Sequence, residues 1–207
     1  MQFYESVMML NVPAPNFSCR STQGTVKLSD YRGRWLVFFS HPADFTPVCT
    51  SEFVAFARAR DAFLAEDCDL LGLSVDSLFS HIAWTGWIEE RFGTLIKFPI
   101  AEDPSMTIAR AYGMLGENAN SSETVRATFL IDPQGIIRAT WWYPMTTGRN
   151  IDEILRTVRA LRTSDTTGTL TPAGWQPGDE VIDADPVRGS MPIADWLYRT
   201  HKPEVAV

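Results

Sequence analysis

The sequence is poor in the residues that most often cross-link small proteins or bind metals. Its 207 residues include three cysteines and three histidines. The cysteines are Cys19, Cys49 and Cys68, and no two of them have C-x-x-C spacing, so neither a disulfide framework nor a dithiol redox motif is indicated. The histidines and cysteines show no spacing that is typical of a zinc site. We therefore expect a reducing compartment, in which a lone cysteine is either catalytic or simply buried.

Long hydrophobic runs and an excess of positive charge are also missing. No apolar segment approaches the ~18 residues needed to span a bilayer. The first basic residue is Arg20, so the start of the chain lacks the basic region of a secretory signal. The net charge of −7 argues against nucleic acid or an anionic membrane as the main partner. We expect a cytoplasmic protein that binds neither nucleic acid nor a membrane.

Strand patterns and helix patterns alternate along the first three quarters of the chain. Short apolar runs predict buried strands, and apolar residues at helical spacing predict amphipathic helices. The segments are strands at 35–40 and 68–75, helices at 47–67, 77–93, 103–113 and 150–162, and a β-hairpin at 127–144. Asp103 is expected to cap the third helix. This order predicts an α/β fold whose mixed sheet carries helices on both faces.

The composition changes near Ser164. After that residue proline and glycine recur and the helical period is lost, yet Trp175, Ile193, Trp196 and Leu197 are strongly apolar. A disordered tail rarely carries tryptophan. We therefore divide the chain into a domain at 1–163 and a C-terminal extension at 164–207, and we expect the extension to pack against a second copy of the chain.

The stretch "HPADFTPVC", residues 41–49, follows the predicted strand at 35–40. Thr46 is a favourable helix N-cap and Pro47 is favoured at the first helical position. Cys49 then lies in the first helical turn, near free backbone N–H groups and the positive end of the helix dipole. Both features stabilise a thiolate, to which the Thr46 hydroxyl can also donate. The pattern predicts a thiol that ionises at neutral pH, although a lone cysteine at a helix start is often only a small buried residue.

Such a thiolate could attack a disulfide, an acyl carbon or a peroxide oxygen. The missing C-x-x-C counts against disulfide exchange. Acyl transfer needs a general base that is oriented by a third group. His41 could be the base, but the neighbouring sequence indicates no group that would orient it. Peroxide reduction needs only donors that polarise the O–O bond. Thr46, the N–H groups of the first turn and an arginine from elsewhere would supply them.

Pro42, Thr46 and Cys49 also form the pattern P-x-x-x-T-x-x-C, which resembles the signature of the peroxiredoxins. The likeness extends to "SVDS", "HIAWTGWIEE" and "YPMTTGRNIDEILR", which resemble the long-tailed one-cysteine subgroup, and "TPAGWQPGDEVI" is similar to the start of its C-terminal domain. The resemblance implies a thioredoxin-like fold, in agreement with the alternating pattern of strands and helices.

The resemblance also implies roles for single residues. Cys49 matches the peroxidatic cysteine, which becomes a sulfenic acid. Thr46 matches the hydroxyl that bonds thiolate and peroxide, and Pro42 matches the residue that shields the thiolate from water. Arg126, in "ETVRATFLID", matches the arginine that stabilises the thiolate and binds the substrate.

Three further residues have an alternative structural interpretation. Glu52, one turn after Cys49, could orient an arginine, or it could simply favour the start of the helix. Arg149 resembles a second arginine of the subgroup's pocket, or else caps a loop carbonyl. His41 resembles a pocket histidine, or is a hydrogen-bonded structural histidine. Cys68 is expected to be inert core, and Cys19 a loop or hairpin residue.

One feature of the subgroup is missing. Some members carry a lipase-like serine with a histidine and an aspartate nearby. At the corresponding places this chain has Arg34, Leu28 and Gln134. Because no nucleophile or base stands there, we do not expect phospholipid hydrolysis.

These observations predict a thiol-dependent peroxidase that reduces hydrogen peroxide and organic hydroperoxides through a sulfenic acid. The expected partners are the peroxide, an external thiol reductant and a second subunit, with a ring of dimers as an alternative assembly. No cofactor and no metal are implied. A peroxide sensor or redox-controlled chaperone is the alternative from another class, and a disulfide reductase is disfavoured.

Overall fold

The computed structural model describes residues 10–115, 124–184 and 198–203. The chain divides into two compact units, Met1–Ile151 and Asp152–Val207, which are described separately. Within the described residues, no helix combines the length and the apolar character needed to cross a bilayer.

The first unit alternates strands with helices, as the sequence predicts. Its strands are β1 (Ser18–Ser21), β2 (Gly24–Lys27), β3 (Trp35–Ser40), β4 (Cys68–Ser74), β5 (Ile100–Glu102), β6 (Arg126–Ile131) and β7 (Ile137–Tyr143). Its helices are the 3₁₀ turn η1 (Leu28–Tyr31), α1 (Pro47–Ala65), α2 (Leu78–Phe92) and α3 (Thr107–Ala111).

The seven strands form one mixed sheet in the order β2-β1-β5-β4-β3-β6-β7. β3 pairs with β4 in parallel and with β6 in antiparallel fashion, and all six of its residues are buried. β6 and β7 form the expected hairpin, closed by a hydrogen bond from Gly135 N to Asp132 O (2.8 Å). The mixed α/β architecture is therefore confirmed.

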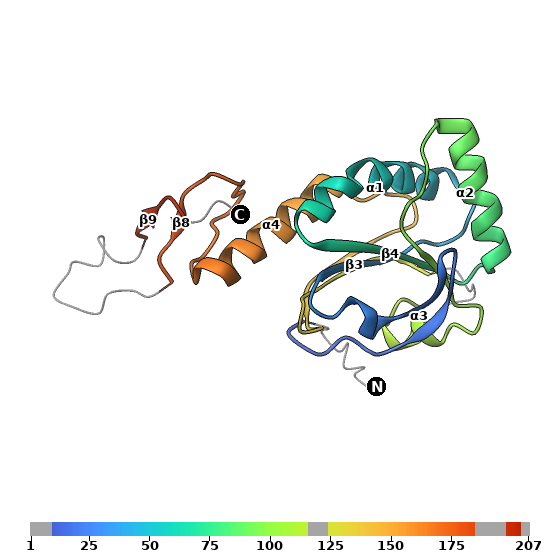
Figure 1. Cartoon of the computed structure of the whole chain (residues 1–207), viewed down its shortest axis with the longest axis horizontal. Coiled ribbons are helices and arrows are strands. Elements are labelled where there is room, and N and C mark those ends of the chain that lie inside the picture. Colours follow the sequence, from blue (N-terminus) through green and yellow to red (C-terminus); the bar gives the residue numbers. More distant parts are fainter. Residues whose placement is uncertain (1–9, 116–123, 185–197, 204–207) are drawn as a thin grey trace, which may run out of the picture. The chain divides into compact units, whose positions relative to one another are not determined.

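Helices cover both faces of the sheet. Figure 1 shows α1 and α2 on one face and α3 on the other. Alternate side chains of β3 pack on opposite faces of the sheet, since successive side chains along a strand point to opposite sides. Phe39 stacks on Phe56 of α1 with 4.2 Å between ring centroids, whereas Phe38 lies 4.9 Å from Tyr112, just after α3. These two aromatic layers hold the central strand, and with it the loop that follows Ser40.

The prediction of a helix over 103–113 is wrong in its start. α3 begins only at Thr107, because Met106 has a left-handed backbone (φ 58°) that helical residues do not adopt. Asp103 still caps the N-terminus of α3, since its carboxylate accepts from the backbone N–H of Thr107 (3.0 Å) and Ala109 (2.7 Å). The residues between Asp103 and Met106 form a turn in place of the expected first helical turn.

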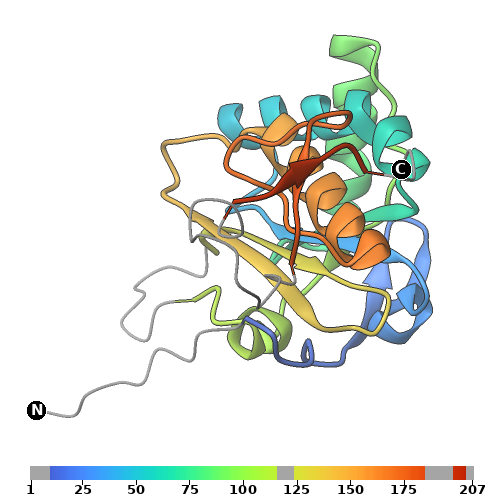
Figure 2. The same ribbon diagram turned by 90° about the vertical axis from the view of Figure 1, so that its left-hand side faces the viewer.

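The second unit contains most of α4 (Ile151–Thr167) and the short antiparallel pair β8 (Val181–Ile182) and β9 (Thr200–His201). α4 runs five residues beyond the predicted end at 162. The chain after α4, orange to red in Figure 2, returns beside that helix, where Trp175 packs with Ala160 and Val181. The boundary at 163/164 stays a prediction, and Ile193, Trp196 and Leu197 lie outside the described residues.

Candidate active site

Cys49 lies where the sequence places it, in the first turn of α1. Thr46 is the N-cap, with an extended backbone (φ −98°, ψ 147°), and Pro47 is the first helical residue. The Cys49 side chain is fully buried, and Pro42 in the preceding loop is buried too. Phe45, next to the N-cap, has a left-handed backbone (φ 56°). This costs about 1–3 kcal/mol in a residue other than glycine, and such conformations cluster at functional sites.

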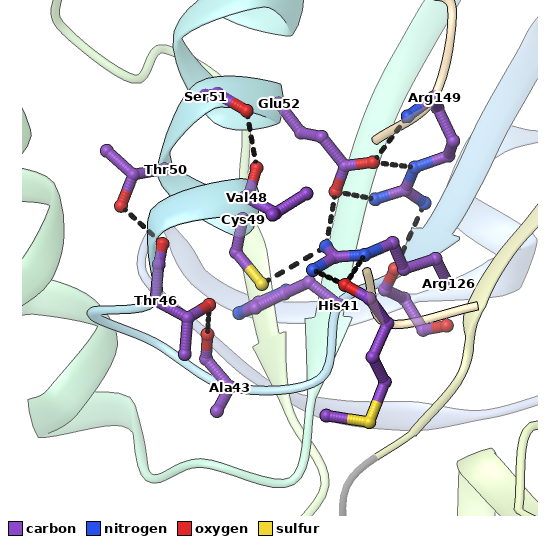
Figure 3. A network of polar contacts seen from close by, with 12 residues as sticks. His41, Ala43, Thr46, Val48, Cys49, Thr50, Ser51, Glu52, Arg126 and Arg149 are labelled. Atoms are coloured by element: carbon purple, nitrogen blue, oxygen red, sulfur yellow. Dashed lines mark hydrogen bonds and ion pairs between the residues drawn. The ribbon is translucent and has the colours of Figure 1, made fainter. Parts of the chain in front are cut away.

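The Thr46 hydroxyl differs from the expectation. Its Oγ1 donates to the carbonyl oxygen of Ala43 (2.9 Å) and makes no capping bond to the helix. Because a hydroxyl carries one proton, a bond from Thr46 to a thiolate requires the hydroxyl to rotate away from Ala43. Thr46 nevertheless lies one turn before Cys49 and is half-buried at the same helix end (Figure 3).

Arg126, the first residue of β6, reaches across to the thiol. Its Nη1 lies 3.2 Å from Cys49 Sγ. The guanidinium is fixed by two further bonds, from Nε (3.1 Å) and Nη2 (2.8 Å) to the carbonyl oxygen of Met145. Figure 3 shows the guanidinium between the sulfur and the carboxylate of Glu52. The sequence separation of 77 residues explains why local pattern alone does not reveal this contact.

Glu52 joins the two arginines. Its Oε2 accepts from Arg126 Nη1 (2.8 Å) and from Arg149 Nη2 (2.7 Å), and its Oε1 accepts from the Arg149 side chain and backbone (2.8 Å each). Burial alone would raise the pKa of this carboxyl. The bonds and charge of Arg149, followed by the charge of Arg126, outweigh burial and hold the pKa of Glu52 below its usual value.

Arg149 anchors the site to the sheet. Its Nη1 donates to the carbonyl oxygens of Ser40 (3.0 Å) and Ala127 (3.1 Å), the former being the last residue of β3. The guanidinium also lies over the Phe39 ring, 5.1 Å from its centroid. Arg149 thus binds carbonyl groups of β3 and β6, which are strand carbonyls and not the expected loop carbonyl, and it also contacts Glu52 in the network around the thiol.

The two arginines and the one glutamate of this network have balanced charges only if Cys49 is a thiolate. Arg126, Arg149 and Glu52 are all buried, and together they carry one excess positive charge. Uncompensated charge in a protein interior is costly. A thiolate on Cys49, in contact with Arg126, would neutralise the cluster, and opposite charge nearby is a recognised way to activate a cysteine.

The structure adds two residues that the sequence reading missed, Asp44 and His81. The carboxylate of Asp44 binds His41 Nε2 through Oδ1 and His81 Nδ1 through Oδ2, at 2.8 Å each. Burial opposes ionisation of Asp44, but the two histidine bonds outweigh it and lower its pKa. Burial also lowers the pKa of His41. The spacing of Asp44 three residues after His41 was available in the sequence, whereas the approach of α2 was not.

His41, Asp44 and His81 are also the one group in the described ranges whose ligand atoms lie close enough, within 4.8 Å of one another, to hold a metal ion. Both carboxylate oxygens are already occupied by ring nitrogens, and neither histidine side chain is exposed. A metal could enter only by displacing both bonds. The geometry therefore fits a hydrogen-bonded triad better than a metal site.

The other two cysteines lie away from Cys49. Cys68 begins β4 opposite Trp35, at the end of β3 remote from the thiol loop, and it is fully buried. Cys19 lies in the β1–β2 hairpin and packs against the core on the α3 face. There it lines a cavity of about 380 Å³ together with Glu102 and Asp103. None of the three cysteines, which all lie within the described ranges, forms a disulfide.

Comparison with protein families finds two matches. Residues 10–140 match the AhpC/TSA family, and residues 160–190 match the C-terminal domain of 1-Cys peroxiredoxin. A peroxiredoxin of Aquifex aeolicus is 53% identical over 83% of this chain and 78% of its own length. A peroxiredoxin of Methanosarcina mazei is 48% identical over 84% of this chain and 82% of its own.

Solved structures give the same result. The peroxiredoxin 6 of Arenicola marina superimposes with a TM-score of 0.85 at 30% identity, over 95% of this chain and 98% of that one. A yeast mitochondrial 1-Cys peroxiredoxin, studied for thiol resolution via glutathione and thioredoxin systems, gives 0.80 at 40% identity, over 86% and 87%. Sequence, fold and thiol environment agree, and the chain belongs to the AhpC/TSA family as a peroxiredoxin, a thiol-dependent peroxidase with a thioredoxin-like fold.

Proposed function

We propose that Cys49 is the peroxidatic residue and that it reduces hydrogen peroxide and small organic hydroperoxides by direct displacement. The thiolate attacks the terminal peroxide oxygen, an S–O bond forms and the O–O bond breaks. Cys49 becomes a sulfenic acid, and the leaving oxygen takes up a proton to give water or an alcohol. Sulfur supplies the electrons, so the step needs no other oxidant or reductant.

The contact between Arg126 Nη1 and Cys49 Sγ at 3.2 Å is the observation that carries this proposal. The excess positive charge of the buried network favours the thiolate, and the same guanidinium can donate to the peroxide oxygens as charge develops on them. Donors held in place before the reaction stabilise the transition state without reorganisation. The bonds from Arg126 to Met145 and Glu52 provide that fixed position.

The remaining predicted site residues take supporting parts. Thr46, after rotation of its hydroxyl, would bond the attacking sulfur and the peroxide, and Pro42 would keep water from the thiolate. Glu52 and Arg149 would hold Arg126 in place. His41, whose ring packs against Phe53 one turn after Cys49 in α1, would accept a hydrogen bond from the hydroxyl of the sulfenic acid.

The cycle would close with an external thiol. The match of residues 160–190 to the C-terminal domain of 1-Cys peroxiredoxin supports a one-cysteine mechanism. An external thiol would attack the Cys49 sulfenic acid, releasing water and forming a mixed disulfide, and a second thiol would then restore the Cys49 thiolate by exchange. The homodimer, the ring of dimers and the cytoplasmic location stay predictions.

Two measurements test the proposal together. Intact mass after one equivalent of peroxide should rise by one oxygen atom, and this gain should be absent in Cys49→Ser. With excess small thiol as reductant the protein should turn over many times. A single round of oxidation followed by arrest would favour the peroxide sensor instead, and oxidation elsewhere than Cys49 would contradict the proposed site.

A further inference from the structure

Asp44 lies between two histidines that are both fully buried, His41 and His81. One carboxylate oxygen binds each ring, at 2.8 Å in both cases. His41 comes from the thiol loop, whereas His81 lies in the first turns of α2. The proposed peroxidase cycle uses only His41, and it gives no part to Asp44 or His81.

The bonds to Asp44 determine where the protons of both rings lie. An ionised carboxylate has no proton and can only accept, so each histidine must donate to it. Neutral imidazole carries a single N–H. His41 therefore carries its proton on Nε2, and its Nδ1 is left as a bare acceptor. By the same reasoning His81 donates from Nδ1.

The free nitrogen of His41 is buried without a hydrogen-bond partner among the described residues, and so is His81 Nε2. A buried polar atom that lacks a partner lowers the stability of the folded protein. The His41 ring packs against Phe53, which lies one turn after Cys49 in α1. An acceptor is thus maintained in the active site at some expense in stability, which is typical of a group whose partner arrives during the reaction.

Packing accounts for the place of the His41 ring but not for its tautomer. The ring centroid lies 4.8 Å from Phe53 and 5.2 Å from Trp84, and these contacts would hold either tautomer equally well. The carboxylate selects the tautomer, because only an Nε2–H can donate to Oδ1. His81 holds the second oxygen, so Asp44 is bound from both sides, and loss of His81 would remove one of the two bonds that keep the carboxylate oriented toward His41 Nε2.

We propose that His81, acting through Asp44, is a positioning residue that keeps His41 in the Nε2–H tautomer, with Nδ1 as the acceptor for the hydroxyl formed on Cys49. The part given to the Cys49 hydroxyl rests on the proposed function. The tautomer does not, because it follows from the two bonds that join Asp44 to His41 and His81.

A matched pair of substitutions at His81 separates positioning from packing. An asparagine amide can donate from nearly the position of a histidine Nδ1, so His81→Asn keeps a donor to Asp44. His81→Leu keeps apolar volume and removes the donor. Nitrogen chemical shifts of the imidazole rings, measured by NMR in the reduced protein, report which nitrogen of His41 carries the proton.

We expect Nε2–H alone at His41 in the wild type and in His81→Asn, and a mixture of tautomers in His81→Leu. Peroxide reduction should slow about ten-fold in His81→Leu, in the range usual for loss of a group that orients a reacting one, and should recover in His81→Asn. An unchanged tautomer in His81→Leu would overturn the proposal. Equal loss of activity in both variants would also overturn it, because packing alone would then explain the effect.

Asp44→Asn provides a second test that does not depend on His81. An amide offers one acceptor and one donor group, so it can accept from one histidine only and must donate to the other. We expect one ring, His41 or His81, to change its tautomer in this variant, and two unchanged rings would contradict the proposal. A wild-type protein that consumed no peroxide would refute the proposed function, yet the same spectra would still decide the tautomer.

Discussion

Glu52 and Arg149 form a buried bidentate ion pair. Arg149 Nε lies 2.8 Å from Oε1 of the carboxylate, and Nη2 lies 2.7 Å from Oε2. Residue 52 belongs to α1 and residue 149 follows β7, so the pair joins parts of the chain that are 97 residues apart. Oε2 of Glu52 also accepts from Arg126, and Arg126 contacts Cys49 Sγ. A substitution of Glu52 is therefore expected to affect the thiol through Arg126.

We predict that Glu52→Gln lowers both stability and activity. The amide keeps the volume of the side chain but leaves two buried arginines without a counter-charge, and breaking a buried pair typically costs about 3–5 kcal/mol. Urea unfolding should show the loss, and peroxide consumption should fall because Arg126 loses one anchor. Glu153→Gln is the matched control. Its pair with Arg156 is only partly buried, and a helix pair within reach of solvent contributes about 1 kcal/mol or less.

The lowered pKa of Glu52 gives a pH test with a definite sign. In the unfolded chain this carboxyl ionises near its ordinary value of 4.5, and in the folded protein it ionises at lower pH. The stability it contributes is therefore present above pH 4.5 and is lost as the pH falls through the folded pKa. We expect the difference in unfolding free energy between wild type and Glu52→Gln to shrink below pH 4.5. A difference that stays constant into acid would contradict this assignment.

Cys49→Ser should abolish peroxide reduction. A serine hydroxyl does not ionise near neutral pH and is a weak nucleophile unless a general base removes its proton. The measurement is peroxide consumption with excess thiol, with folding checked by circular dichroism. Cys68→Ser is the control, since Cys68 lies at the far end of β3 and β4. Retention of most of the activity in Cys49→Ser would remove the central claim.

Arg126→Ala should leave less Cys49 thiolate at neutral pH and slow the reaction by about 10²-fold or more, the scale usual for losing a donor to the transition state. The charge next to the sulfur is removed, and with it the donor at 3.2 Å. Ultraviolet absorbance of the thiolate and single-turnover oxidation measure the two effects. Arg34→Ala, which breaks a surface pair with Asp69, is the control. Equal thiolate absorbance in Arg126→Ala and wild type would place Arg126 outside the thiol's electrostatic environment.

The local parts of the site could be predicted because their causes are local. A buried strand, a Thr-Pro helix start and a cysteine two residues after Pro47 follow from short-range rules, and the structure has all three. Only the family resemblance predicts Arg126 and Arg149, since their contacts with α1 span 74 to 97 residues. The place of Glu52 one turn after Cys49 makes it a candidate partner for an arginine, but no local pattern shows that both arginines share it.

The missed features depend on tertiary packing. Nothing in the local sequence indicates that Asp44 and His81 meet, because only the packing of α2 brings them within hydrogen-bond distance. The early start predicted for α3 failed for a related reason. Asp103 and Pro104 have the residue types of a helix start, but Met106 takes a left-handed conformation and the helix begins one turn later.

The last prediction concerns how the oxidised Cys49 is resolved. Cys68 cannot reach it, because a disulfide needs Cα atoms within about 7 Å. The parallel pairing sets Cys68 opposite Trp35, and the six residues of β3 span roughly 20 Å before the thiol loop begins. Cys19 packs on the α3 face of the sheet, whereas Cys49 belongs to α1 on the other face. Burial, with the charges of Asp103 and Glu102, raises the pKa of Cys19 to about 11, so at neutral pH it is a protonated, weak nucleophile.

We therefore expect the Cys19→Ser/Cys68→Ser double variant to keep near-wild-type turnover with a small thiol as reductant. Steady-state peroxide consumption at several thiol concentrations measures this, and non-reducing peptide mapping of the oxidised wild type shows which sulfurs are joined. In a one-cysteine cycle the rate depends on the external thiol equally in both proteins, because that thiol alone attacks the sulfenic acid. A disulfide between Cys49 and either other cysteine, together with a large loss of turnover in the double variant, would show instead that the chain resolves itself.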